Sequence, residues 1–452
     1  MKLKSIFTFL SCLLLVLFAH TQKYNSWKSL FDGKTLNGWK QIAGTAPYEV
    51  INGEIVGTAV VGKVNSFLVT DRSYKDFILE LEARIEDSTI NSGVQFRSAM
   101  DYKTGKVYGY QFEVEGSSRR WSGGIYDESR RMWLYPMTLN QSARKAFILE
   151  GYNKIRIECK GNIVRTWLNG VPASHLIDSA TTPGFIALQV HNITKDSLAG
   201  KKIHWRNIRI KTTNIELTPF PNEIFIVNTL FNNVSEQEKK NGWKLLFDGK
   251  TNKGWRGAHK QTFPAQGWSI RNGELIVQSS EGKESTNGGD IVTIKKYKAF
   301  DLTFDFNLTP GANSGVKYFV TLKENNEGSA IGLEYQVLDD TLHPDAKMGR
   351  NGNRTMASLY DLIPAVKQTR FINQPGNWNR GRIVVYPNNH VEHYLNGIKV
   401  LEYQRGSAAF RELVEISKYK IWPGFGEADA GHILLQDHGN EVRFRSVKIR
   451  EL

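Results

Sequence analysis

Hydrophobic and polar residues alternate with a period of two along most of the chain. Residues 77–85 (Phe-Ile-Leu-Glu-Leu-Glu-Ala-Arg-Ile) show the pattern, which returns at 154–159, 164–168, 382–386 and 391–395. Because successive side chains of a strand point to opposite faces, this pattern predicts short β-strands that each turn one face to a core. Helical periodicity is almost absent from the sequence.

Turn signals separate the predicted strands. Asn-Gly pairs stand at 52–53, 169–170, 272–273 and 396–397, and both residues tolerate the positive φ that tight hairpin turns need. Many short strands joined by such turns predict an all-β fold, an antiparallel two-sheet sandwich or jelly roll. A sandwich of this size commonly curves, so we expect a ligand on a concave outer face.

The pattern occurs twice in the chain. Short motifs recur in the same order about 220 residues apart, among them Phe31-Asp32-Gly33-Lys34-Thr35 with Phe247-Asp248-Gly249-Lys250-Thr251, Asn91-Ser92-Gly93-Val94 with Asn313-Ser314-Gly315-Val316, and Gln189 and His191 with Gln436 and His438. Such a series predicts two homologous domains, residues 23–213 and 241–452. Residues 214–240 interrupt it and are expected to form a linker whose apolar centre packs on a domain.

The N-terminus has the features of an export signal. Lys2 and Lys4 precede an apolar run that ends before His20, which predicts a cleaved signal peptide over residues 1–22 and a periplasmic or extracellular protein. Cys12 weakly suggests a lipid anchor, but the apolar run continues beyond it, which favours cleavage. Cys159 is then the one cysteine left, so no intrachain disulfide is expected.

The net charge of the chain bears mainly on whether it binds nucleic acid. The 452 residues carry a formal charge of +14, yet lysine and arginine are scattered among acidic residues without a basic run, which argues against a nucleic-acid partner. The apolar N-terminal run is too short for a membrane span.

Polar side chains gather at one predicted strand of the second copy. In residues 331–338, Leu333, Tyr335 and Val337 share the core face, while Glu334 and Gln336 share the other. An acidic loop with a histidine follows directly, containing Asp339, Asp340, His343 and Asp345. We therefore expect the chemistry of the protein to lie here.

The first copy has a weaker version of this arrangement. Gln111 and Glu113 point away from the core, with the amide and the acid in exchanged positions. In both copies alternation also places a glutamine and a histidine near a strand end on the outer face. Arg97 follows the same alternation and is expected to point outward, either into a site or simply to solvent. Trp121, Trp133 and Trp378 either stack on sugar rings or pack in the core or at the rim.

As a set, these motifs resemble the 3-keto-disaccharide hydrolase family, which has a concanavalin A-like jelly-roll domain. The resemblance covers about residues 27–212 and 243–452 and includes the segments 334–340, 358–362 and 431–439. It implies two tandem domains of this fold and a sugar substrate oxidised at C3. The first copy is similar to a second subtype and lacks the loop of Asp339, Asp340 and His343, which leaves open whether both copies do the same work.

A ketone at C3 acidifies the C2 proton, so the implied reaction is base-catalysed elimination at C1 followed by hydration. In the second copy we expect Glu334 or His438 as the base. The residues expected around that sugar are Gln336, Asp339, Asp340, His343, Tyr360 and Gln436. In the first copy we expect Glu113 and His191 as catalytic groups, surrounded by Arg97, Gln111, Tyr126, Asp127 and Gln189.

Several alternatives stay open on the sequence. No cofactor is obligatory, but Asp339, Asp340, His343, Asp345 and His438 offer ligands for a divalent cation that would stabilise an enolate. A non-catalytic, lectin-like carbohydrate-binding pair suits the same fold. A retaining β-glucanase is disfavoured because its Glu-x-Asp-x-x-Glu motif is missing, and an adhesive surface protein would leave the acidic loop unexplained.

Overall fold

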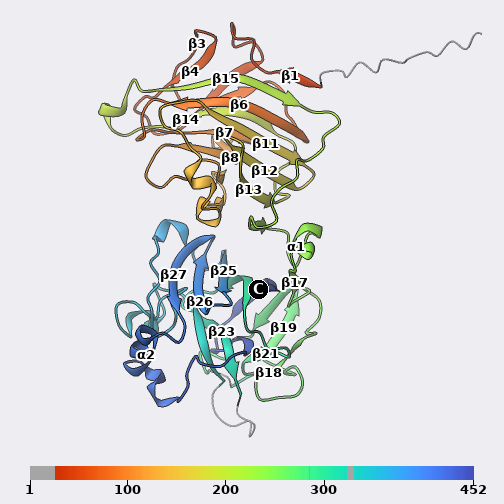
Figure 1. Cartoon of the computed structure of the whole chain (residues 1–452), viewed down its shortest axis with the longest axis vertical. Coiled ribbons are helices and arrows are strands. Elements are labelled where there is room, and N and C mark those ends of the chain that lie inside the picture. Colours follow the sequence, from red (N-terminus) through yellow and green to blue (C-terminus); the bar gives the residue numbers. More distant parts are fainter. Residues whose placement is uncertain (1–25, 285, 323–329) are drawn as a thin grey trace, which may run out of the picture.

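The computed structural model describes residues 26–452 apart from residue 285 and residues 323–329. The predicted signal peptide and Cys12 lie outside this part of the chain. Within the described residues, no helix is long and apolar enough to cross a membrane. Four β-sheets form two bodies that lie end to end, here called the first and second domains (Figure 1).

The first domain pairs two sheets. The first-domain back sheet contains, in spatial order, β16 (Ile226–Asn228), β13 (Val171–Ile177), β12 (Ile163–Leu168), β11 (Asn153–Lys160), β6 (Phe77–Ile85), β15 (Lys202–Lys211), β4 (Glu54–Thr58) and β3 (Tyr48–Ile51), with β1 (Trp27–Ser29) beside β15. The first-domain front sheet contains β10 (Met132–Tyr135), β9 (Ile125–Glu128), β8 (Lys106–Glu115), β7 (Asn91–Asp101), β14 (Phe185–Val190), β5 (Ser66–Thr70) and β2 (Trp39–Ala43).

The second domain repeats this plan. The second-domain back sheet contains β19 (Trp268–Arg271), β20 (Glu274–Val277), β29 (Val442–Glu451), β22 (Phe300–Leu308), β25 (Trp378–Val385), β26 (His390–Leu395) and β27 (Ile398–Gln404), with β17 (Lys244–Leu245) beside β29. The second-domain front sheet contains β18 (Trp255–Gly257), β21 (Ile291–Thr293), β28 (His432–Leu435), β23 (Asn313–Thr321) and β24 (Ile331–Leu338).

Helices are few and short. The α-helices are α1 (Glu236–Lys240) and α2 (Ala408–Glu415). The 3-10 helices are η1 (Met137–Leu139), η2 (Ala143–Lys145), η3 (Asp196–Leu198), η4 (Pro344–Lys347), η5 (Thr369–Phe371) and η6 (Lys418–Ile421). The predicted all-β sandwich fold is therefore confirmed.

Each core lies between the two sheets of its domain. In β22, Phe300, Leu302 and Phe304 are fully buried and belong to the second-domain core cluster. Each such side chain stabilises the fold by about 1.5–3 kcal/mol. The intervening Asp301, Thr303 and Asp305 point to the other face of the back sheet, as the period of two requires.

The segment between the domains is built into the structure. As the apolar centre suggested, β16 packs on the first domain, where it pairs in parallel with β13. Ser235 and Glu238 form a capping box at the start of α1, and the Glu238 carboxylate binds the Lys448 ammonium of β29. Residues 214–240 thus join the two domains as an ordered bridge.

The domains also touch directly. The Thr138 hydroxyl donates to the Gly397 carbonyl oxygen, with 2.6 Å between the two oxygens. Gly397 has a φ of 80°, and a Cβ there would lie 2.8 Å from Pro136 Cγ. This close approach across the interface therefore requires glycine.

Candidate functional site

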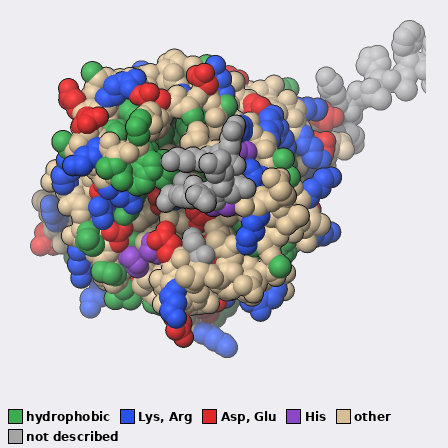
Figure 2. Space-filling view, turned by 90° about the horizontal axis from the view of Figure 1, so that it is seen from below, with side chains coloured by type: hydrophobic (Ala, Val, Ile, Leu, Met, Phe, Trp, Pro, Cys, Tyr) green, Lys and Arg blue, Asp and Glu red, His purple; other side chains and the backbone are tan. Residues whose placement is uncertain are grey.

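A cavity of about 860 Å³ opens on the outer face of the second-domain front sheet. It is named the front cavity here. The face of the molecule seen in Figure 2 is hollowed, with acidic and histidine side chains gathered around the hollow. Of the residues predicted from the sequence, seven line the front cavity, namely Glu334, Gln336, His343, Asp345, Tyr360, Gln436 and His438.

Strand pairing sets the centre of the front cavity. Lys317 of β23 lies opposite Glu334 of β24, and Gly315 lies opposite Gln336. A Cβ at Gly315 would lie 2.3 Å from Glu334 Oε1, so this glycine leaves room for the carboxylate. The Lys317 ammonium is also 4.0 Å from an Asp290 carboxylate oxygen. A lysine thus lies among acidic groups at the base of the cavity.

Burial tunes these charges. It raises the pKa of Glu334, an effect that the nearby Lys317, Lys418 and His438 partly oppose. Burial alone would lower the pKa of Lys317, but Glu334 and Asp290 raise it above its ordinary value. The cavity therefore holds a charged lysine beside a carboxylate that gives up its proton later than an exposed glutamate.

Two histidines face each other at the rim. The rings of His343 and His438 are 6.0 Å apart and perpendicular. The His343 Nδ1 accepts a hydrogen bond from the Asp345 backbone N–H at 3.2 Å, and burial lowers the pKa of His343. His438 Nε2 lies 3.8 Å from a carboxylate oxygen of Glu284. One histidine is thus fixed by the loop, and the other faces the cavity from the end of β28.

A hydrogen-bonded chain orients Tyr360. Its backbone N–H donates to the Glu334 carbonyl oxygen at 3.0 Å, and its hydroxyl donates to Asp345 Oδ2 at 2.8 Å. Arg354 binds the other oxygen of Asp345 at 2.9 Å. Burial raises the pKa of Tyr360, and Lys418 Nζ lies 4.3 Å from the centre of its ring. Tyr360 is therefore a neutral hydroxyl in a fixed position.

Two amides complete the cavity wall. With its nitrogen turned toward Glu334, Gln336 donates to Glu334 Oε1 and to the Ser314 carbonyl oxygen, at 3.1 Å each. The Gln436 Oε1 is buried, and no described residue donates to it. Gln436 thus has an acceptor available for a bound molecule.

Asp339 and Asp340 lie outside the front cavity, contrary to expectation. Asp339 accepts backbone N–H groups of Gly311, Thr341 and Leu342. Asp340 accepts the Met356 N–H and pairs with Lys367 at 2.7 Å. Both carboxylates fix the loop that carries His343.

The predicted five-residue cation site does not assemble, because Asp339 and Asp340 lie outside the front cavity and only His343, Asp345 and His438 of the five line it. Within the described chain, the group spaced closely enough for a metal is His390, Glu392 and Glu402, on β26 and β27 and away from the front cavity. The Lys399 ammonium already pairs with both of these glutamates, at 3.2 and 2.6 Å.

Lys317, Asp290 and Lys418 are cavity residues that the sequence interpretation missed. Lys317 had a signal, because it stands two residues after Gly315 on the outward face of the same strand. Asp290 and Lys418 follow irregular segments whose course a period of two does not predict.

The corresponding position of the first domain carries no such charges. Gln95 lies opposite Gln111, and the Gln95 Nε2 donates to the Gln111 Oε1 at 2.7 Å. These two amides take the places of Lys317 and Glu334 in the equivalent strands. Phe67 pairs with Gln189, whereas extending the β21–β28 register by one residue sets Asp290 beside Gln436. The first domain therefore has neutral residues, Phe67, Gln95 and Gln111, at the positions where the second domain has Asp290, Lys317 and Glu334.

Glu113 is the buried acid of the first-domain front sheet. It accepts hydrogen bonds from Asn91 at 2.8 Å and Gln111 at 3.0 Å, and it pairs with Arg119 at 3.2 Å. Burial raises the pKa of Glu113 to about 7, with Arg119 opposing the rise. The Glu128 pKa is likewise raised to about 7 by burial.

The other first-domain candidates divide into two groups. The Gln189 amide is buried near Glu128, whose pKa it lowers, and the ring nitrogen Nδ1 of His191 lies 2.7 Å from the Asn192 carbonyl oxygen. Tyr126 shares a face of β9 with Glu128. Asp127 points the opposite way, where it pairs with Arg130 and Arg131 at 2.6 and 2.5 Å, so it lies outside the row of outward-facing amides.

Arg97 corrects a second expectation. Its φ of 48° breaks the alternation of β7, and the side chain is fully buried rather than outward-facing. The guanidinium donates to the carbonyl oxygens of Lys75 and Gly161 at 2.7 and 2.8 Å and pairs with Asp76 at 3.0 Å. Arg97 therefore ties the two sheets of the first domain together.

The three tryptophans considered in the sequence analysis lie away from the front cavity, which Trp422 lines instead. Trp121 is buried against Trp133, with 4.6 Å between ring centres, and against Phe371 of the second domain. Trp133 and Trp378 line a separate cavity between the domains.

Glu113→Gln is expected to flatten the pH dependence of stability. With a folded pKa of about 7 against an ordinary 4.5, the folded state binds more protons than the unfolded state, so unfolding free energy falls as pH rises through this window. The variant lacks this loss and should gain on the order of 2 kcal/mol over the parent protein between pH 4 and pH 8. Calorimetric unfolding at both pH values measures the difference, and parallel behaviour of the two proteins would contradict it.

The chain is similar to known proteins over both of its domains. The family model of the 3-keto-alpha-glucoside-1,2-lyase-like domain matches residues 26–211 and 242–450. A 3-keto-disaccharide hydrolase of Bacteroides thetaiotaomicron is 38% identical over 233 residues, which span 47% of this chain and 79% of that protein. A solved Parabacteroides distasonis protein, assigned provisionally to the glycosyl hydrolases, is 30% identical with a TM-score of 0.43 and covers 49% of this chain and 99% of its own.

The two matched segments together account for most of the chain, and each contains one pair of sheets. The match to the Bacteroides protein extends over more than two thirds of that relative. The chain therefore belongs to the family of 3-keto-alpha-glucoside-1,2-lyase-like domains, as the sequence motifs indicated.

Proposed function

We propose that the front cavity of the second domain cleaves 3-keto-glycosides by elimination and hydration. The observation that carries the proposal is the strand register that sets Lys317 opposite Glu334 in the lining of the cavity, with Asp290 beside the lysine. Family membership and the 3-keto-disaccharide hydrolase relative support a hydrolase that acts on a carbohydrate.

The first step suits Glu334 as the base. Its carboxylate takes the proton from C2, the C2–H electrons form a C1–C2 double bond, and the C1–O bond to the leaving group breaks. The carbonyl at C3 stabilises the developing enolate, so no second carboxylate is needed as a nucleophile. A carboxylate whose pKa is raised by burial is a stronger base than an exposed one.

Charge that develops on the C3 oxygen needs a donor. The Lys317 ammonium and the neutral Tyr360 hydroxyl both line the cavity with Glu334, and such preorganised donors stabilise an enolate strongly in a water-poor site. His438 then protonates the departing oxygen. Water adds across the double bond, with hydroxide at C1 and a proton at C2, so the net reaction is hydrolysis.

A binding role suits the first domain. Its outer face keeps the amides, including the buried Gln189, but has Gln95 and Gln111 where the second domain has a lysine and a carboxylate. We propose that this face holds a saccharide without cleaving it. Saturation-transfer NMR with a disaccharide detects such binding, and Gln189→Leu should abolish the first-domain signal. Its persistence would contradict the role.

We also propose that the protein is exported and that residues 1–22 are its cleaved signal peptide. N-terminal sequencing of the protein secreted by a bacterial host should give a chain that begins near Thr21 or Gln22. An intact Met1 would contradict it.

Deuterium incorporation tests the chemistry. In D₂O, elimination and hydration should place one deuterium at C2 of the released 3-keto-sugar. Direct displacement at C1 leaves C2 with its original proton. Mass spectrometry at early times, corrected by an enzyme-free exchange control, distinguishes the two, and an unlabelled C2 would contradict the proposal.

Lys418→Met should move the pH profile of activity. Lys418 lowers the pKa of Glu334, so its loss should shift the rising limb of kcat/KM to higher pH. Lys420→Met on the same 3-10 helix, which does not line the cavity, is the matched control. A limb that stays in place or moves to lower pH would contradict the assignment of Glu334 as the base.

A further inference from the structure

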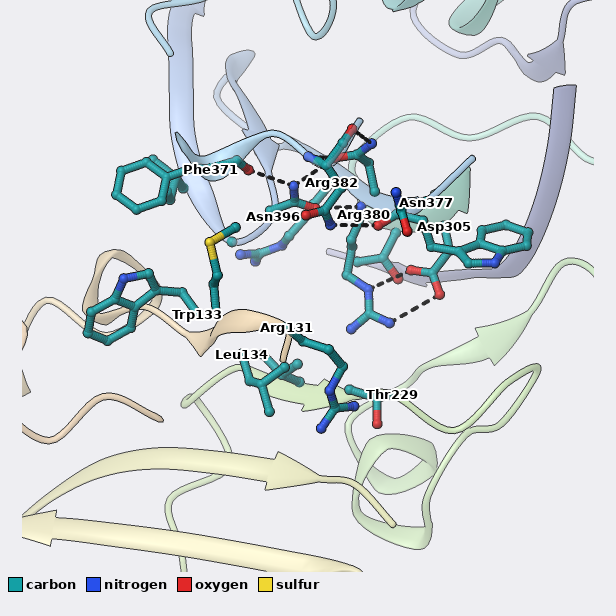
Figure 3. A pocket seen from close by; sticks show the side chains of 18 of the residues that line it. Arg131, Trp133, Leu134, Thr229, Asp305, Phe371, Asn377, Arg380, Arg382 and Asn396 are labelled. Carbon is teal, nitrogen blue, oxygen red and sulfur yellow. Dashed lines mark hydrogen bonds and ion pairs between the residues drawn. The ribbon is translucent and has the colours of Figure 1, made fainter. Parts of the chain in front are cut away.

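A second cavity, of about 430 Å³, lies between the two domains and is named the interdomain cavity here (Figure 3). One wall is the outer face of the second-domain back sheet, supplied by β22, β25 and β29. The opposite wall comes from β10 and from the bridge of residues 214–240. It lies on the other side of the second-domain sandwich from the front cavity and shares no lining residue with it.

Positive charge dominates the interdomain cavity. One aspartate, Asp305, and five arginines line it, namely Arg130, Arg131, Arg380, Arg382 and Arg445. Asp305 binds Arg380 at 2.7 Å and lies 3.6 Å from Arg445, and three carboxylates behind the wall, Asp127, Asp178 and Asp301, bind Arg130, Arg131 and Arg382. Four carboxylates thus pair with the five lining arginines. They also pair with a sixth, Arg450, which lies 3.0 Å from Asp301. An excess of positive charge remains.

Two buried polar atoms in this wall lack a hydrogen bond within the described residues. Thr303 is 2% exposed, and its Oγ1 has no hydrogen-bond partner among the described residues. Thr303 shares the outward face of β22 with Asp305, so its hydroxyl points to the cavity side. The Arg445 Nε is also buried without a hydrogen bond to the described residues and makes only a long ion pair with Asp305, at 3.6 Å. Unpaired buried donors destabilise a fold unless a ligand satisfies them.

Aromatic rings surround the same guanidinium. Arg445 lies between Phe231 of the bridge and Trp378 of β25, at 3.6 and 3.7 Å from the ring centres. Arg382 lies 4.1 Å from the centre of Phe225. Flat apolar walls beside unpaired donors suit a ligand with a ring-shaped body and a charged end.

We propose that the interdomain cavity binds a small organic oxyanion, with its carboxylate, sulfate or phosphate at Arg445 and Thr303 and its ring body against Phe231 and Trp378. The volume suits a single small molecule. Both domains and the bridge supply the walls, so such a ligand would hold the domains together.

Calorimetric titration of the full chain tests this site. The probes are 4-nitrobenzoate, 4-nitrophenyl sulfate and 4-nitrophenyl phosphate, with 4-nitrobenzyl alcohol as the neutral comparator and inorganic phosphate as the anion without a body. At least one ring oxyanion should bind, and both comparators should bind at least tenfold more weakly. The order of the affinities for the three oxyanions identifies the acidic group that the site prefers. Failure of all three to bind, or equal binding of the neutral comparator, would overturn the proposal.

Variants place the binding. Arg445→Met should weaken it at least tenfold, and Thr303→Val, which keeps the side-chain shape, should weaken it several-fold. Arg443→Gln is the matched control, because Arg443 stands on the same strand but does not line the interdomain cavity. Unchanged binding in both Arg445→Met and Thr303→Val, or an equal loss in Arg443→Gln, would overturn the proposal. Thr303→Val keeps the test decisive if Arg445→Met does not fold.

Discussion

Glu334→Gln is expected to lower kcat/KM for a 3-keto-disaccharide by about 10³-fold, the loss typical of a missing general base. The substitution keeps the shape of the side chain but replaces the carboxylate, which accepts the C2 proton, with an amide that cannot. Lys317→Met should cost about 10²–10³-fold, because the enolate then loses its charged donor. Initial rates of sugar release at several substrate concentrations measure both effects.

Glu113→Gln is the matched control in the first domain. Glu113 is the buried carboxylate of the equivalent sheet, but it faces Gln111 and Asn91 and has no lysine opposite it. Its loss should change kcat/KM by less than about twofold. A large loss in this variant, or full activity in Glu334→Gln, would move the reaction to the first domain.

Lys448→Met is expected to have the largest effect on stability. Lys448 and Glu238 form an ion pair with side chains only 5% and 1% exposed. Burial opposes the ionisation of Glu238, but Lys448 holds its pKa below the ordinary value. Without the lysine, a buried carboxylate loses its partner, and the free energy of unfolding should fall by about 3–5 kcal/mol.

Unfolding in urea, followed by tryptophan fluorescence, measures this loss. The double variant Lys448→Met/Glu238→Gln removes both charges and should regain much of the stability, since no uncompensated charge is left. Lys239→Met in the same helix is the control, because its pair with Glu236 is exposed and contributes little. A single variant as stable as the parent would show that this pair does not hold the bridge to the second domain.

The fold was predictable from alternation because a strand in a sandwich has one face in a core. Strand β24 illustrates this. Its residues Leu333, Tyr335 and Val337 point into the core, and the alternating Glu334 and Gln336 point into the front cavity. Arg97 shows the limit of the method. A single residue with positive φ reverses the faces of β7 after Phe96, and no residue type in the sequence marks that bulge.

The site was predictable only in part. Strand residues such as Glu334 and Gln336 were found, since alternation assigns their faces. The loop residues His343, Tyr360 and His438 were found as well, but the direction of other loop side chains depends on the hydrogen bonds of the loop. Asp339 and Asp340 stand beside the site in sequence, yet their oxygens bind backbone N–H groups and Lys367. Asp290 reaches the cavity from a segment without any periodic pattern.

The interdomain cavity lay beyond any sequence argument. Its walls come from segments that lie more than 300 residues apart in the sequence, such as those of Trp133 and Arg445. Their meeting depends on how β16 extends a sheet of the first domain while Glu238 binds the second.

The most direct test is sugar release by the full chain from a 3-keto-disaccharide and from its unoxidised parent under identical conditions. Cleavage of the keto substrate alone, and its loss in Glu334→Gln, is the result expected of C2-proton abstraction in the front cavity. Cleavage of both substrates at similar rates, or binding of the keto substrate without turnover, would contradict the proposed function.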